Sequence, residues 1–147
     1  MYATIVFLHV LGASVWVGGH LVLAISVLPR ALKARKPEIL LGFERGFERV
    51  GMPALLLQVV TGSWLALTYV PRIADWFNLS ARVPAHILLK LALLVGTLLL
   101  AFSARFRVIP RVTPDTSKTL AWHIILVTVF AVLFVAVGVS LRTGLLF

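Results

Sequence analysis

Hydrophobic positions run almost unbroken through four stretches of the chain, and polar positions collect between them. The stretches cover roughly residues 4–28, 51–69, 85–102 and 120–141. A helix needs about 20 apolar residues to cross a bilayer core, and lipid admits only helices or closed barrels, because every backbone polar group must be satisfied internally. The pattern therefore predicts an all-α fold, an integral membrane four-helix bundle in which residues 1–147 form a single domain.

Composition supports this class. The chain is 61% hydrophobic and 13% charged, and its mean hydropathy is +1.04, outside the range of soluble domains. The first stretch lacks a basic leading segment and is too long for a signal peptide, so we expect it to remain in the mature protein. No cysteine is present, which excludes disulfides, iron–sulfur clusters and thiolate metal sites.

The net charge of +9 lies mainly in the connections between the stretches. The first connection carries Arg30, Lys33, Arg35, Lys36, Arg45 and Arg49, and the third carries Arg105, Arg107, Arg111 and Lys118. The second carries only Arg72 and Arg82. The positive-inside rule then places both termini on the outer, periplasmic side of a bacterial inner membrane. Since topology accounts for the charge, we infer no nucleic-acid partner.

Two smaller polar features bear on helix packing. The repeat GFERGFER places Phe43 and Phe47 on one helical face. It is either an interfacial helix that touches a partner or lipid headgroups, or an extension of the second span with mixed surface charges, and we prefer the extension. Gln58 and Thr61 lie near the middle of the second span, where interhelical hydrogen bonds are their expected role.

The four histidines sort into two depths. His9 and His20 are eleven residues apart on one predicted helix, which leaves them about 20° apart around the axis and about 16 Å apart along it. With both termini outside, His9 lies near the outer surface and His20 in the inner half. His86 begins the third span at the outer level, and His123 begins the fourth at the inner level.

Paired imidazoles from two helices are how a bundle holds a six-coordinate haem. We therefore predict two haem b groups, with His9 and His86 as axial ligands of one and His20 and His123 of the other. Gly12 and Gly19 would leave room for the macrocycles, and Trp16 would pack on a ring. Each histidine is otherwise a hydrogen-bonded packing residue, an alternative that the sequence leaves open.

Cations are available for haem propionates at both levels. Lys90 lies one turn below His86 and lacks a carboxylate in the spans, so it needs a propionate or an acidic substrate, unless it snorkels to the surface. Further propionate partners are predicted to be Arg82 and Arg142 at the outer level, and Arg30, Arg105 and Lys118 at the inner level.

Three segments carry a family resemblance. FLHVLGASVWVGGHLVLAISVLPRALK, VVTGSWLALTYV and ILLKLALLVGTLLLAFSARFRV resemble the first three helices of the CopD and HemJ group of membrane proteins. The resemblance implies copper resistance or uptake for a CopD-like protein, and protoporphyrinogen oxidation with bound haem b for a HemJ-like one. It places the group's first-helix histidine on His9 and its third-helix lysine on Lys90. HemJ proteins have a histidine two residues before that lysine, whereas His86 precedes Lys90 by four.

The leading interpretation is a di-haem b cytochrome that passes electrons across the lipid bilayer, with a quinone, a quinol or a small redox protein as partner. A homo-oligomer is compatible with it, and no catalytic residue is assigned. The first alternative is a CopD-like copper transport or resistance protein. The sequence argues against it because Met1 and Met52 are its only soft, sulfur-containing ligands. A HemJ-like oxidase and a structural subunit are the others.

Overall fold

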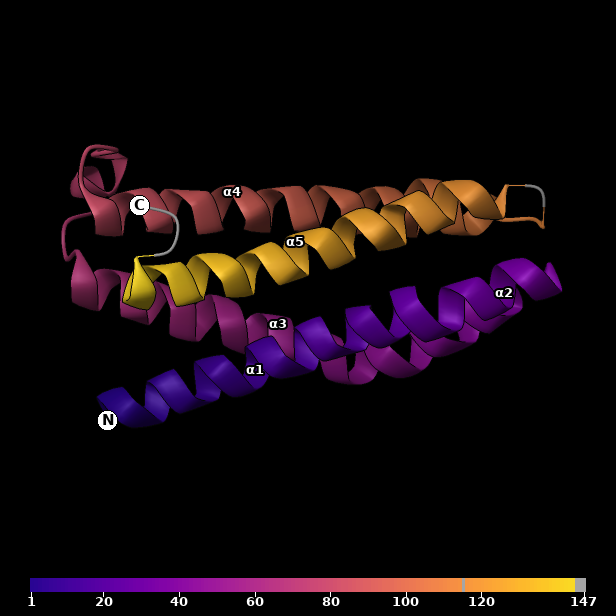
Figure 1. Ribbon diagram of the computed structural model, residues 1–147, viewed down its shortest axis with the longest axis horizontal. Coiled ribbons are helices and arrows are strands. Elements are labelled where there is room, and N and C mark those ends of the chain that lie inside the picture. The colour runs from indigo at the N-terminus through magenta and orange to yellow at the C-terminus, as the bar shows by residue number, and fades with distance from the viewer. Residues whose placement is uncertain (115, 145–147) are drawn as a thin grey trace.

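The computed structural model describes residues 1–114 and 116–144, and every element within them is helical (Figure 1). The first rod consists of α1 (Tyr2–Val22), the π-helical turn η1 (Leu23–Val27) and α2 (Leu28–Ala34), and the second is α3 (Glu38–Tyr69). A 3-10 turn, η2 (Ile73–Phe77), leads to α4 (Arg82–Ser103), which continues through the π-helical η3 (Ala104–Val108) and the 3-10 turn η4 (Ile109–Arg111). The last rod is α5 (Ser117–Thr143).

Four rods are long and apolar enough to cross a membrane, which confirms the predicted all-α membrane bundle. They run over Tyr2–Ala34, Glu38–Tyr69, Arg82–Arg111 and Ser117–Thr143. Each contains one of the predicted stretches and extends beyond it, with lengths of 33, 32, 30 and 27 residues. The GFERGFER repeat belongs to α3, as expected for an extension of the second span. Such extensions carry charged side chains at one end of the rods.

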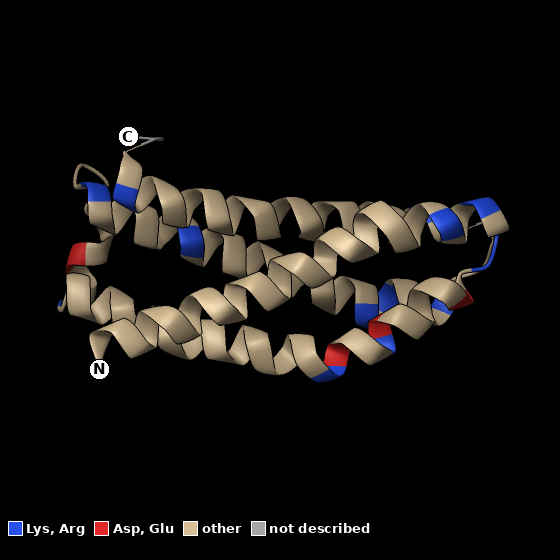
Figure 2. Ribbon diagram, turned by 60° about the horizontal axis from the view of Figure 1, so that its bottom comes forward, with Lys and Arg blue, Asp and Glu red and all other residues tan. Residues whose placement is uncertain are grey.

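The rods are arranged as two antiparallel pairs. α1 packs along α3, α4 packs along α5, and α1 also contacts α5 (Figure 1). The N-terminus and the last turn of α5 lie at the same end of the bundle as η2, while the α2–α3 turn and the α4–α5 connection lie at the opposite end. Most Lys and Arg residues gather toward that opposite end (Figure 2). The side of the membrane that each end faces stays a prediction.

The outer surface of the rods is apolar over most of its length. Large side chains such as Phe7, Ile25, Leu56 and Leu99 are 63%, 72%, 65% and 65% exposed. A soluble protein rarely shows continuous apolar surface of this extent, whereas in a bilayer such side chains face acyl chains that are equally apolar. The multi-pass membrane assignment therefore rests on the surface as well as on helix length.

The interior is mostly apolar at one end and more polar at the other. At the α2–α3 turn, the buried hydrophobic residues form one cluster of Leu23, Leu28, Ala31, Leu40, Leu120, Ala121 and Ile124. Ser117 at the start of α5 is buried as well. Toward the end that carries the N-terminus, the buried residues include Thr61, His86 and Ser140. Buried polar groups in lipid need partners inside the protein, so the hydrogen bonds of this polar end decide how the helices meet.

In the first two rods, two prolines interrupt the pattern of helical backbone hydrogen bonds. Pro29 lies in the first turn of α2, directly after η1, and Pro53 lies inside α3. Because proline has no amide hydrogen, each removes the donor for the carbonyl four residues earlier, at Ile25 and Arg49. The π-helical turn η1 is the local adjustment that continues the first rod past Pro29.

Candidate imidazole sites

Three of the four histidines bond to the backbone of their own helix through Nδ1. The Nδ1–H groups of His20, His86 and His123 donate to carbonyl oxygens one turn earlier, of Trp16, Arg82 and Thr119, at 2.8, 2.7 and 2.9 Å. A carbonyl oxygen can only accept, so Nδ1 carries the hydrogen in each ring. In the neutral imidazole, Nε2 then holds the free lone pair.

His9 has the same tautomer but bonds to a neighbouring helix. Its Nδ1 lies 2.8 Å from Oγ1 of Thr61 on α3. The Thr61 hydroxyl donates its one hydrogen to the carbonyl of Leu57 at 2.5 Å, so its oxygen accepts from His9. The side-chain amide of Gln58 also donates to the backbone carbonyl of His9. Gln58 and Thr61 therefore join α3 to α1, which confirms the interhelical role predicted for both.

His86 and His123 use their second nitrogen as well. Nε2 of His86 accepts from the hydroxyl of Ser140 at 3.1 Å, and Nε2 of His123 accepts from the hydroxyl of Ser103 at 3.1 Å. Both hydrogen bonds connect α4 to α5. The two imidazoles therefore link α4 to α5, and the Nε2 lone pair of each ring accepts a hydrogen bond. Nothing in the sequence pattern singled out Ser103 or Ser140, because a serine in a membrane span is most often a packing residue.

The two histidines of α1 differ from this pair. Within the described residues, Nε2 of His9 and Nε2 of His20 form no hydrogen bond. The His20 ring is buried and lies 4.4 Å from the Trp16 ring and 5.5 Å, edge on, from the Phe47 ring, measured between centroids. A neutral imidazole held through Nδ1–H, with Nε2 free, is the form in which histidine binds metals.

The predicted haem-packing residues contact protein instead. A Cβ added at Gly12 would lie 2.8 Å from Nε2 of Gln58, and one at Gly19 would overlap the Phe47 ring. The room assigned to macrocycles is therefore filled by α3, and Trp16 packs on His20. Together with the engaged lone pairs of His86 and His123, this arrangement does not fit two bis-imidazole haem sites. The haem interpretation finds no support in the structure, and the ligand roles of the four histidines stay predictions.

Lys90 lies half-buried in the same interior. Within the described chain it forms no ion pair and no hydrogen bond, so the carboxylate partner that it needs is not found there. Its Nζ faces α5, where a Cβ added at Gly138 would lie 3.4 Å away. The Lys90 charge acts electrostatically on His9. An ammonium group therefore shares the polar end of the bundle with the first α1 imidazole.

The other predicted propionate partners are spread over the surface. Arg82 donates to the carbonyl of Ser140 at 2.7 Å, where it contacts the end of α5 and its terminal carbonyls. Arg30, Arg142 and Lys118 are exposed. Arg105 is exposed as well and lines a cleft beside α3. Arg82 adjoins His86, whose Nδ1–H donates to its carbonyl oxygen, and within the described residues the other four form no hydrogen bond with a histidine side chain. The role of all five toward a ligand stays a prediction.

Comparison with known families gives one match. The family model for Copper resistance protein D matches residues 41–141, which is 101 of the 147 residues. The chain belongs to the copper resistance protein D family. The matched segment takes in most of α3, all of α4 and nearly all of α5, so it includes His86 and His123, whereas His9 and His20 precede it. Unlike the sequence resemblance, it omits the first helix and extends over the last one. Searches of curated proteins and of solved structures returned no significant match.

Membership of the copper resistance protein D family directs attention to metal ligands. Within residues 1–114 and 116–144, no group of three or more His, Asp or Glu side chains is placed to hold a metal ion. A tight site of the structural type, with four protein ligands, is therefore not formed by the described residues. Any copper bound here would meet one or two imidazoles at a time.

Proposed function

We propose that this protein handles copper in the membrane, as a transport or resistance protein, and that copper is the cargo of two weak imidazole sites on α1. One observation carries the proposal. His9 and His20 present Nε2 lone pairs that no described residue engages, whereas those of His86 and His123 are engaged by serines. Membership of the copper resistance protein D family supports the choice of metal.

The chemistry of the two sites suits a metal that passes through. Imidazole nitrogen is a ligand for copper, and a hydrogen bond to Nδ1–H orients the ring and raises its basicity. Each site offers one imidazole, so affinity is low. A transported ion must bind well enough to enter and weakly enough to leave. The two rings stand about 16 Å apart along α1, which places them at two depths in the bilayer.

Copper titration of single variants tests the proposal. The full chain is purified in detergent and titrated with copper(II) by equilibrium dialysis, which measures weak binding without a competing chelator. We expect His9→Ala and His20→Ala each to remove one of two copper equivalents. The matched variants His86→Ala and His123→Ala should keep both equivalents, although they lower the unfolding temperature by breaking the α4–α5 hydrogen bonds.

Two results would overturn this proposal. One is copper binding that stays unchanged when both α1 histidines are replaced. The other is a visible spectrum and a pyridine haemochrome count that reveal two haems per chain in protein purified from haem-replete cells. That second result would return the function to electron transfer, with all four histidines as axial ligands.

A further inference from the structure

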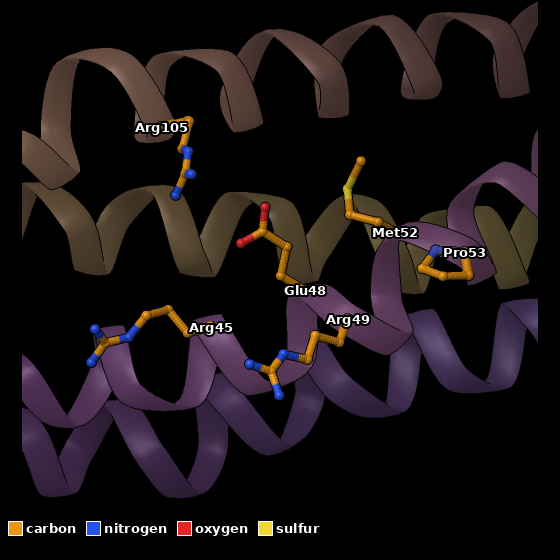
Figure 3. A pocket seen from close by; sticks show the side chains of 6 residues that line it. All are labelled: Arg45, Glu48, Arg49, Met52, Pro53 and Arg105. Atoms are coloured by element: carbon orange, nitrogen blue, oxygen red, sulfur yellow. The ribbon is translucent and has the colours of Figure 1, made fainter.

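A cleft of about 640 Å³ opens between α3 and η3, at the boundary between the charged and the apolar parts of α3. The residues that line it come from both segments and are Arg45, Glu48, Arg49, Met52, Pro53 and Arg105. Figure 3 shows the Arg105 side chain reaching from η3 toward Glu48 on α3. The copper sites lie on α1, so this cleft is a separate feature of the molecule.

The three arginines of the cleft have unused donors. Among the described residues, Arg45, Arg49 and Arg105 form no hydrogen bond and no ion pair within 4.0 Å. Glu48 is the one acidic residue that lines the cleft, and the Arg105 charge also acts on Glu44 nearby without forming an ion pair. An arginine carries five donors in a planar fork, which binds the oxygens of a phosphate group in pairs. The cleft therefore favours an anion that carries several acceptor oxygens.

The apolar side of the cleft narrows the choice of anion. Met52 is 55% exposed, and beside it lies Pro53, where α3 enters its apolar stretch. A free phosphate ion would leave this side in contact with water. A phospholipid would place its phosphate against the guanidinium groups and its acyl chain along Met52. Basic pockets between membrane helices at the headgroup level are suited to this ligand class.

We propose that the cleft between α3 and η3 binds the headgroup of an anionic phospholipid, whose charge is attracted by Arg45, Arg49 and Arg105 along the walls of the cleft. Glu48 disfavours dianionic headgroups that approach its carboxylate and favours those whose hydroxyl groups can donate to it. Bound lipid would join the two helix pairs at this end of the bundle.

Lipid binding is measured on the full chain in detergent by native mass spectrometry, with phosphatidylglycerol and phosphatidylcholine of matched acyl chains, and without copper. We expect Arg105→Gln and Arg49→Gln each to weaken phosphatidylglycerol binding about fivefold, the effect of one cation at a membrane surface. Arg107→Gln, an exposed change of equal charge in the same η3 turn and outside the cleft, is the matched control and should change binding less than twofold. Thermal unfolding of each variant confirms that the fold is intact.

Three outcomes would contradict the proposal. Equal losses of phosphatidylglycerol affinity in Arg105→Gln and Arg107→Gln would mean that the lipid responds to the overall positive charge and not to the cleft. Equal binding of phosphatidylglycerol and phosphatidylcholine would exclude recognition of the anion. Displacement of the lipid by millimolar inorganic phosphate would make the ligand a soluble anion instead of a lipid. Since no arm uses copper, failure here leaves the copper proposal untouched.

Discussion

The hydroxyl oxygen of Ser140 lies 3.1 Å from Nε2 of His86, and it links α5 to α4 at a point where both side chains are fully buried. Ser140→Ala should remove this buried hydrogen bond and lower the free energy of unfolding by about 1 kcal/mol. Denaturant unfolding in mixed micelles measures this. The control is Ser14→Ala, whose exposed hydroxyl bonds only within its own helix, to Val10. Equal effects of the two changes would mean that the buried bond adds nothing.

Adjacent glycines on α1 should respond in opposite ways to the same substitution. A Cβ at Gly19 overlaps the rigid Phe47 ring, whereas a Cβ at Gly18 meets nothing within 4 Å. Gly19→Ala should therefore separate α1 from α3 and lower the unfolding temperature, while Gly18→Ala should be neutral or stabilising by up to about 1 kcal/mol, through helix propensity. The double variant Gly19→Ala/Phe47→Leu should recover part of the loss. A Gly19→Ala protein as stable as the parent would disprove the close contact between α1 and α3.

The Thr61 hydroxyl orients the His9 ring, so removal of this hydroxyl should weaken copper binding. Thr61→Val removes the acceptor of Nδ1–H, and loss of such a supporting bond typically weakens metal binding about 10-fold or more. Equilibrium dialysis with copper(II) should show this at one of the two sites. Thr68→Val is the matched control on the same helix, because that hydroxyl is exposed and bonds only to the Trp64 carbonyl. If the two variants bind copper alike, His9 is no part of a copper site.

Replacing Lys90 with a neutral side chain should strengthen copper binding at the His9 site. The ammonium group acts on His9 and has no acidic partner in the described part of the chain, so it opposes a copper ion at Nε2 by charge repulsion. Lys90→Met should therefore raise copper affinity at the His9 site several-fold and leave the His20 site unchanged. Lys118→Met, at an exposed position far along the chain, should change neither. Weaker copper binding in Lys90→Met would instead make the lysine a contributor to the site.

Helix number, helix type and the interhelical roles of Gln58 and Thr61 were predictable from the sequence. An apolar stretch of about 20 residues in lipid forms a helix, because its backbone polar groups must bond within the segment. A polar side chain in such a stretch needs a hydrogen-bond partner on a neighbouring helix or on its own. Short motifs in three helices also predicted the family. They did not decide between a copper function and a haem function.

The interhelical partners of His9, His86 and His123 were decided only by the tertiary structure. Helical spacing fixes the depth of a residue and its angle around the helix axis. For His9 and His20, which are eleven residues apart, both the difference in depth and the difference in angle could therefore be predicted from the sequence. Neither quantity says which helix stands opposite. The packing of α1 on α3 and of α4 on α5 placed Thr61 beside His9, Ser140 beside His86 and Phe47 beside Gly19. Lateral order depends on the fit of whole helix surfaces, a property that no single span contains.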